Sequence, residues 1–165
     1  MDLNEPKLKT AAKFLKNIDF EMAYLAVLTS FGIKPLSRWE KNLSPKGLEK
    51  LSELGLLTRQ IKRTVKIGKE ITECVFSTSL GYLELYETKF AGKPVDKSPQ
   101  TVRLEGFLFG YPPCCVDRFI RHPYAKNELE PAQQKILFHW ACKDCKITAL
   151  LLPAYIKIHD FLSKI

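Results

Sequence analysis

Hydrophobic residues recur every three or four positions in two stretches near the N-terminus, and this spacing predicts two amphipathic helices. The first covers residues 7–18 and the second covers residues 20–31. A third helix is predicted at residues 45–54, because Ser44 suits an N-cap and Pro45 suits the first helical turn. The chain is therefore expected to begin with a group of helices.

The pattern changes from helical to β-prone after this third helix. Residues 57–67 and 70–78 are rich in Ile, Val, Thr and Phe, and a Gly-Lys pair joins them. Two such runs, separated by two residues with Gly first, predict a β-hairpin. A short element begins at residues 35–39, and a further helix is predicted at residues 80–90.

Proline and glycine divide the second half of the chain. Residues 91–99 have the composition of a connecting loop, and residues 101–109 are expected to form a helix. Two prolines then precede a helix at residues 114–121. A long helix is expected from residue 131 to residue 151, after which Pro153 can introduce a kink. We therefore expect a mainly α protein with a small β-hairpin.

Composition agrees with a folded protein in one or two small domains. Of the 165 residues, 45% are hydrophobic and 27% are charged, which is typical of a globular chain. No apolar run approaches the roughly 20 residues that span a bilayer. The acidic residues near the N-terminus are unlike a signal peptide, so a cytoplasmic protein without a membrane partner is expected. We place a domain boundary after the last predicted helix of the first half, giving residues 1–92 and residues 93–165.

Two runs in the first half resemble winged helix-turn-helix proteins. The run Leu-Ser-Pro-Lys-Gly-Leu-Glu-Lys-Leu-Ser-Glu-Leu-Gly-Leu-Leu-Thr-Arg, from Leu43 to Arg59, resembles a recognition helix and first wing strand. The run from Phe76 to Tyr86 resembles the second wing strand and following helix of MarR-like members. The resemblance implies that residues 1–92 form a winged-helix domain that binds DNA as a homodimer.

The net charge of +8 is spread over both halves and favours acidic partners such as nucleic acid. The candidate nucleic-acid contacts are the cations of the predicted recognition helix and hairpin: Lys46, Lys50, Arg59, Lys62, Arg63, Lys66 and Lys69. The recognition helix also carries Glu49 and Glu53 and lacks the Arg, Asn or Gln that usually read bases. A winged helix that docks proteins, or that is purely structural, is the alternative.

Four cysteines in the second half are the strongest sign of chemistry. Cys114 and Cys115 lie in the first turn of a predicted helix, where the helix dipole favours thiolate. His139, Cys142 and Cys145 recur every three residues, which would place them on one face of the predicted long helix. These five residues are the candidate metal ligands. The fifth cysteine, Cys74, lies without partners in a predicted strand and is interpreted as a packing residue.

Several kinds of cysteine site fit this pattern. Thiolates with a nearby imidazole suit zinc or an iron–sulfur cluster. Adjacent cysteines are awkward on one zinc ion, so a cluster is slightly favoured at this stage. A disulfide between the two cysteine pairs, with no metal, remains open if the source is a hyperthermophile, and simple packing is the third interpretation.

The cysteine segments also resemble a known sequence family. Gly-Tyr-Pro-x-Cys-Cys with a following Phe, and a distant His-x-x-Cys-x-x-Cys-x-x-Thr, are similar to an archaeal family described as domain of unknown function 483. The matching residues are Gly110, Tyr111, Pro112, Cys114, Cys115, Phe119, Cys142 and Cys145. The resemblance implies an archaeal source and carries no activity.

The sequence leads to three functional hypotheses. The preferred one is a regulator whose nucleic-acid affinity is coupled to a metal, iron–sulfur or redox site. The second is an enzyme in which a Cys thiolate or a Cys-bound cluster reacts, with His139 as a base. The third is a scaffold that docks a protein through Trp39, Tyr82 and Tyr86, although packing in the core or at its rim is the favoured interpretation of these aromatic residues.

Overall fold

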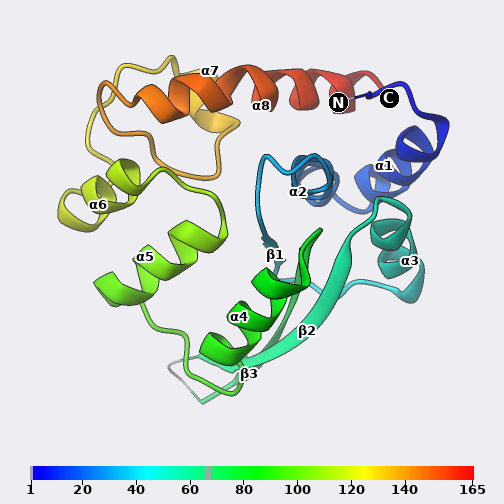
Figure 1. Ribbon diagram of the computed structural model, residues 1–165, viewed down its shortest axis with the longest axis horizontal. Helices are drawn as coiled ribbons and strands as arrows, with labels where there is room; N and C mark the ends of the chain where they lie inside the picture. The colour runs from blue at the N-terminus through cyan, green and yellow to red at the C-terminus, as the bar shows by residue number, and fades with distance from the viewer. Residues whose placement is uncertain (1, 66–67) are drawn as a thin grey trace.

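A computed structural model describes residues 2–65 and 68–165 of the chain. Within these residues the fold has eight helices and one three-stranded antiparallel sheet (Figure 1). In chain order the elements are α1 (Pro6–Ile18), α2 (Phe20–Ser30), β1 (Ser37–Trp39), α3 (Pro45–Glu53), β2 (Leu57–Thr64), β3 (Glu70–Ser77), α4 (Leu80–Phe90), α5 (Pro99–Leu108), α6 (Pro113–Arg121), α7 (Pro131–Lys135) and α8 (Lys146–Lys164). The expected mainly helical chain with a β-hairpin is confirmed.

The sheet has the strand order β1-β3-β2. β2 and β3 form the predicted hairpin, with Leu57 opposite Ser77 and Thr64 opposite Glu70. The short element at residues 35–39 contains β1, which pairs with the other edge of β3 and places Trp39 opposite Cys74. The predicted hairpin therefore gains a third strand, and α4 packs against β2 and β3.

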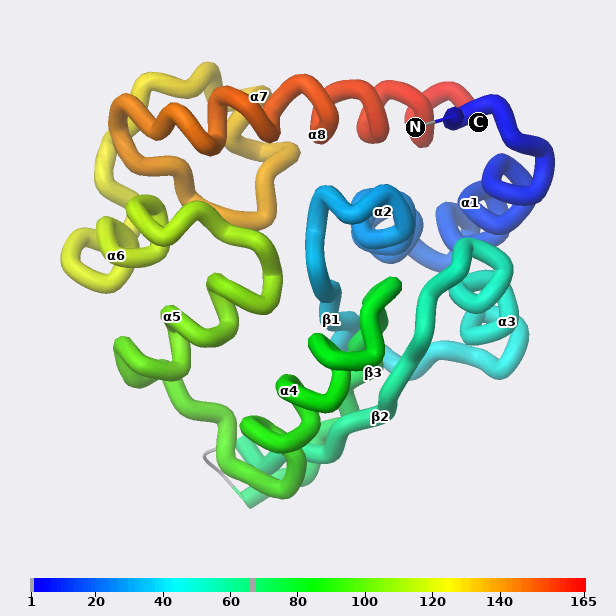
Figure 2. The backbone as a smooth tube through the Cα atoms, viewed as in Figure 1, coloured from blue at the N-terminus to red at the C-terminus, as the bar shows by residue number. Residues whose placement is uncertain are grey.

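Helix α2 lies at the centre of the molecule, next to α1, α8 and β1 (Figure 2). Its side chains are buried without a break from Met22 to Thr29. Tyr24 reaches from α2 to the C-terminal part, where its hydroxyl donates to the carbonyl oxygens of Tyr155 and Ile136, both at 3.1 Å. Because residues from α1, α2 and α8 belong to one hydrophobic cluster, the predicted parts 1–92 and 93–165 share a core.

The long helix predicted from residue 131 to residue 151 is wrong. The chain forms the five-residue helix α7, then a loop at residues 136–145, and only then α8. The side chain of Gln134 explains the break, because it donates to the carbonyl of His139 (2.9 Å) and accepts from the backbone N–H of Ala141 (3.1 Å). These bonds satisfy backbone groups that a helix would have paired internally.

α8 continues through Pro153 without a break in the helix. Proline has no backbone N–H, so this position lacks one helical hydrogen bond. Among the described residues, no helix combines the length and apolar character needed to cross a membrane.

A buried network of charges joins the sheet to α5. Arg63 of β2 is 1% exposed, and its Nη1 lies 3.7 Å from Glu73 of β3 and 3.2 Å from Glu105 of α5. Arg38 shares the same Glu105 oxygen at 2.8 Å. The hydroxyl of Tyr86 donates to Glu73 at 2.7 Å. The network therefore ties three strands and two helices together through buried polar contacts.

A second link between the two halves is the buried ammonium group of Lys34, which is 1% exposed. It donates to the carbonyl of Phe109 at 2.9 Å and lies 4.7 Å from the ring centroid of Tyr111 and 5.1 Å from that of Phe138. Burial lowers the pKa of Lys34 to about 7. The aromatic faces and one carbonyl replace part of the solvation that this cation loses.

Replacing Arg63 with Met should lower the free energy of unfolding by about 3–5 kcal/mol, because Glu73 and Glu105 would lose a buried partner. The control is Lys62→Met, on the same strand but with a side chain that is 68% exposed; it should change stability by less than about 0.5 kcal/mol. Urea denaturation of both variants measures the difference. Equal effects would mean that the network contributes nothing.

The lowered pKa of Lys34 predicts a pH dependence of stability. Between pH 7 and pH 9 the unfolded chain keeps a proton on Lys34 that the folded protein has released. The free energy of unfolding of the wild type, relative to Lys34→Met, should therefore rise by up to about 1.4 kcal/mol per pH unit in this window. Parallel pH profiles for the two proteins would contradict the shift.

Candidate metal centre

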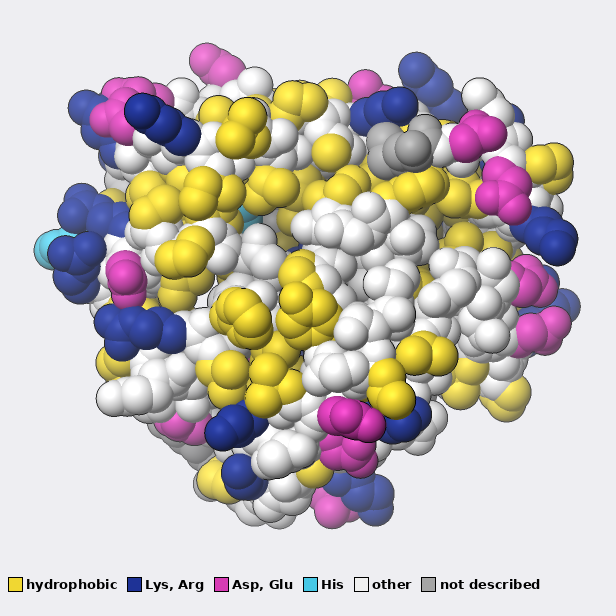
Figure 3. Space-filling model, viewed as in Figure 1, with side chains coloured by type: hydrophobic (Ala, Val, Ile, Leu, Met, Phe, Trp, Pro, Cys, Tyr) yellow, Lys and Arg dark blue, Asp and Glu magenta, His cyan; other side chains and the backbone are white. Residues whose placement is uncertain are grey.

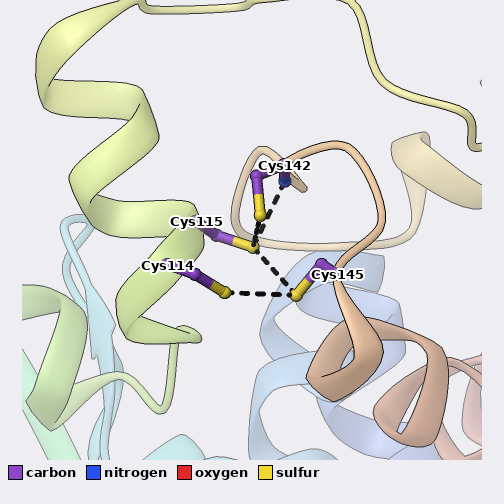
Figure 4. A group of neighbouring side chains, drawn as sticks. All are labelled: Cys114, Cys115, Cys142 and Cys145. Carbon is purple, nitrogen blue, oxygen red and sulfur yellow. Dashed lines mark hydrogen bonds between the residues drawn. The ribbon is translucent and has the colours of Figure 1, made fainter.

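The four predicted cysteines of the second half converge on one point, from two segments that face each other (Figure 4). Cys114 and Cys115 come from the first turn of α6, whereas Cys142 lies in the loop after α7 and Cys145 is the N-cap of α8. The centre therefore joins two segments that are about thirty residues apart in the sequence.

Two glycines set the position of α6. A Cβ atom on Gly106 of α5 would lie 2.6 Å from a methyl carbon of Val116, so α5 and α6 approach each other closely at this point. Gly110 has a φ of 72°, and a Cβ atom there would lie 2.6 Å from Pro35. These contacts hold the start of α6, and with it both adjacent cysteines, against the N-terminal half.

The four sulfur atoms lie within 4.8 Å of one another. The Sγ atoms are separated by 3.5 Å for Cys114 and Cys145, 3.7 Å for Cys115 and Cys142, and 3.4 Å for Cys115 and Cys145. A disulfide bond is about 2.05 Å long, and all five cysteines of the chain are free thiols. The predicted disulfide alternative is therefore absent, and the arrangement could hold a metal ion.

A tight turn brings Cys142 and Cys145 together. Asp144 has a φ of 58°, in the left-handed region that non-glycine residues seldom occupy. The turn leaves Cys145 as N-cap, where its sulfur accepts a hydrogen bond from the backbone N–H of Thr148 at 3.3 Å. The expected helical face of His139, Cys142 and Cys145 does not form, because all three lie outside a helix.

The thiols differ in acidity. Burial and the neighbouring sulfur atoms raise the pKa of Cys114 to about 11, and burial raises the pKa of Cys115 further. Although burial opposes it, hydrogen bonds from Thr148 lower the pKa of Cys145 to about 7. The sequence argument that the α6 dipole favours thiolate at Cys114 and Cys115 is therefore outweighed by desolvation, and the most acidic thiol begins α8 instead.

His139 lies beside the four sulfur atoms and does not belong to the group that they form. Its Nε2 is 2.9 Å from the hydroxyl of Thr148, which is itself 3.6 Å from Cys115 Sγ. Burial, followed by the charge of Lys34, lowers the pKa of His139 to about 4, so the ring is neutral at pH 7. His139, a predicted metal ligand, is therefore linked to the sulfur atom of Cys115 through the hydroxyl of Thr148 and is not itself part of the sulfur group. Cys74 lies in the core, as predicted.

Thr148, the last residue of the His-x-x-Cys-x-x-Cys-x-x-Thr pattern, has a role at this centre that the sequence did not predict. It is 1% exposed and contacts Cys115, Cys145 and His139. Its position three residues after Cys145 is the only sequence signal, since an N-cap group bonds the backbone three residues later.

The predicted nucleic-acid contacts lie in different environments. The prediction that Arg63 is a surface cation is wrong, because Arg63 is buried in the charge network. Lys50 pairs with Glu53, Arg59 lies 3.7 Å from Glu87, and Lys62 lies 3.4 Å from Glu70. Lys46 lies over the Phe14 ring, and Lys69 is exposed. Lys66 lies outside the described residues.

The predicted docking surface of Trp39, Tyr82 and Tyr86 does not exist as a surface. Trp39 is 4% exposed and Tyr86 is fully buried, while Tyr82 is half-buried. Tyr86 instead contributes its hydroxyl to the charge network.

Comparison with known proteins adds no relative. The chain matches no protein-family model, and no significant match was found among curated proteins or among solved structures. The likenesses to MarR-like proteins and to the archaeal family therefore stay predictions.

Proposed function

We propose that the protein binds one metal ion through Cys114, Cys115, Cys142 and Cys145, in a mononuclear tetrathiolate centre, and that zinc is its physiological ion. The observation that carries the proposal is the convergence of all four sulfur atoms within 4.8 Å. Thiolates are the ligands that zinc prefers in structural sites, and four of them complete its coordination.

The spacing of the sulfur atoms favours one ion over a cluster. In a tetrahedral site with Zn–S bonds of about 2.3 Å, the ligand sulfurs are about 3.8 Å apart. Three of the sulfur pairs, at 3.4–3.7 Å, are close to this distance, and all pairs lie within 4.8 Å. In a four-iron cluster each cysteine binds a different iron atom, so the cysteine sulfur atoms must lie farther apart than they do around a single ion. From the sequence, adjacent cysteines were expected to fit one zinc ion poorly. In the structure both sulfur atoms reach the common point, because Cys114 and Cys115 lie in the first turn of α6.

The electrostatics of the centre support bound thiolates. Four thiolates and one divalent ion carry net negative charge, and the N-termini of both α6 and α8 lie at the centre. The positive ends of two helix dipoles stabilise such a charge. The backbone N–H of Cys142 donates to Cys115 at 3.3 Å, and Thr148 donates to Cys145. Metal binding would thus fasten α6 to the start of α8, a structural role.

Metal analysis of protein purified without oxygen should find one zinc ion per chain and no acid-labile sulfide. Changing Cys142 to Ser should reduce the bound metal to less than half, and Cys74→Ala is the matched control that should keep one ion per chain. Cobalt in place of zinc should give the intense visible absorption of a tetrahedral thiolate site. Iron with sulfide, or metal retained by the Cys142 variant, would refute the mononuclear centre.

Duplex DNA binding by a winged helix is the second candidate function. Two observations support it. The sheet has the strand order β1-β3-β2, and along the chain α3 lies between β1 and β2. Ser44 also caps α3, because its side chain accepts a hydrogen bond from the backbone N–H of Gly47 at 3.2 Å. Such a protein would bind as a symmetric dimer. The network of Arg63 and Glu105 would then link the wing strands through α5 to α6 and its cysteines, so that metal loss affects DNA affinity.

This candidate predicts the effect of removing charge from the hairpin. Changing Lys62 and Lys69 together to Ala should weaken duplex binding and reduce the slope of log K against log salt by about 1.8. A salt titration followed by fluorescence anisotropy measures the slope. An unchanged slope would mean that the hairpin does not contact DNA.

The enzymatic hypothesis has less support. That hypothesis assigns His139 as the base that would take up the proton of a thiol. His139 points its Nε2 at Thr148, and its pKa of about 4 leaves it a weak base.

A further inference from the structure

An open groove on the cysteine-containing part combines aromatic and basic side chains. It has a volume of about 920 Å³ and lies between the end of α6, the following turn and the loop after α7. Phe119, Tyr124 and Trp140 line it, together with Lys126 and Lys135. It contains none of the four cysteines and no residue of the hairpin, and His139, which lies beside the sulfur atoms, is one of its lining residues.

Tyr124 is displayed in an unusual way. Its ring is 68% exposed, and its backbone has a φ of 57°, which is strained for a residue of this size. The ring meets Phe119 and Trp140 edge to face, with centroids 5.2 Å and 5.4 Å away. Trp140 is itself fixed, because its Nε1 donates to the carbonyl of Ala125 at 2.7 Å. Tyr124 therefore contacts two aromatic rings, one of them fixed by a hydrogen bond, and is itself largely exposed to solvent.

The lining of the groove carries a net positive charge, from two lysines and one glutamate. Neither Lys126 nor Lys135 has a carboxylate within salt-bridge distance among the described residues. Glu130, which also lines the groove, uses its side chain to cap α7 through the backbone N–H of Gln133. Two further exposed cations, Arg118 and Arg121, lie on the last turn of α6. On the face drawn in Figure 3, Lys and Arg side chains gather over the α6 end of the molecule.

We infer that this groove binds single-stranded nucleic acid, with a base stacked on Tyr124 and phosphates bound by Lys126 and Lys135. An exposed ring beside unpaired cations is the combination that holds single strands without reading sequence, since every base has a flat face and every linkage a charge. A duplex keeps its bases stacked inside, so it can use the cations of the groove and not the ring. The groove also has apolar lining residues, such as Leu129 and Leu137, that would suit a peptide, but the two unpaired lysines favour a ligand that carries phosphate groups.

Fluorescence anisotropy with fluorescein-labelled rU12, dT12 and a 12-base-pair duplex tests the inference. The wild type should bind both single strands more tightly than the duplex, and the two single strands distinguish RNA from DNA as the source of the ligand. Tyr124→Ala should weaken single-strand binding roughly tenfold, and Tyr124→Phe should restore it, because stacking requires only the ring. Phe107→Ala is the matched control, since Phe107 is an aromatic residue that is 59% exposed elsewhere.

A second pair of variants tests the charges. Lys126→Ala with Lys135→Ala should lower the salt slope for rU12 by about 1.4, whereas Lys7→Ala with Lys9→Ala, exposed on α1, should leave it unchanged. Absence of binding to both single strands, or equal binding by wild type and Tyr124→Ala, would overturn the inference. Metal content, measured on each sample, separates the two proposals: zinc-loaded protein without oligonucleotide binding refutes only the groove, and metal-free protein that binds refutes only the centre.

Discussion

The burial of α2 is the constraint on which the rest of the structure depends. A helix that is apolar all round must be covered on every side, and both halves of the chain supply the cover. Since α1, β1 and β3 cover part of it, the remainder is covered by α8, from the far end of the sequence. This packing fixes where α8 begins, and the N-cap of α8 is a cysteine.

Specific polar contacts then define how the second half sits on this core. Lys34, in the segment between α2 and β1, places its ammonium group beside three aromatic rings. Glu105 of α5 contacts two guanidinium groups from the sheet. Buried charges of this kind cost free energy unless they are paired, so they stabilise only one arrangement of the two halves. The four sulfur atoms add a third connection, between α6 and α8, whose strength depends on a bound ion.

Local patterns were sufficient to predict most helices, the hairpin and the grouping of four cysteines. Each predicted helix had an apolar face or a capping residue, and these signals depend only on residues that are close together in the sequence. The loop after α7 was not predictable, because its cause is a single side chain, Gln134, that bonds backbone groups five and seven residues later. The burial of Arg63 escaped prediction for a similar reason. Its partner Glu105 is 42 residues away, and an alternating strand pattern does not reveal which charges pair inside.

α8 is a single long helix with one proline in its interior, and it connects the cysteine centre with the N-terminal helices. Its 19 residues span about 28 Å, so the cysteine at one end and the residues that touch α1 at the other are mechanically connected. Pro153 interrupts the hydrogen-bond ladder near the middle. The segment before Pro153 carries the cysteine that caps the helix, and the segment after it contributes Tyr155 and His159, which contact Tyr24 of α2. A movement caused by metal loss at Cys145 would therefore have to pass the missing hydrogen bond before it reached the common core.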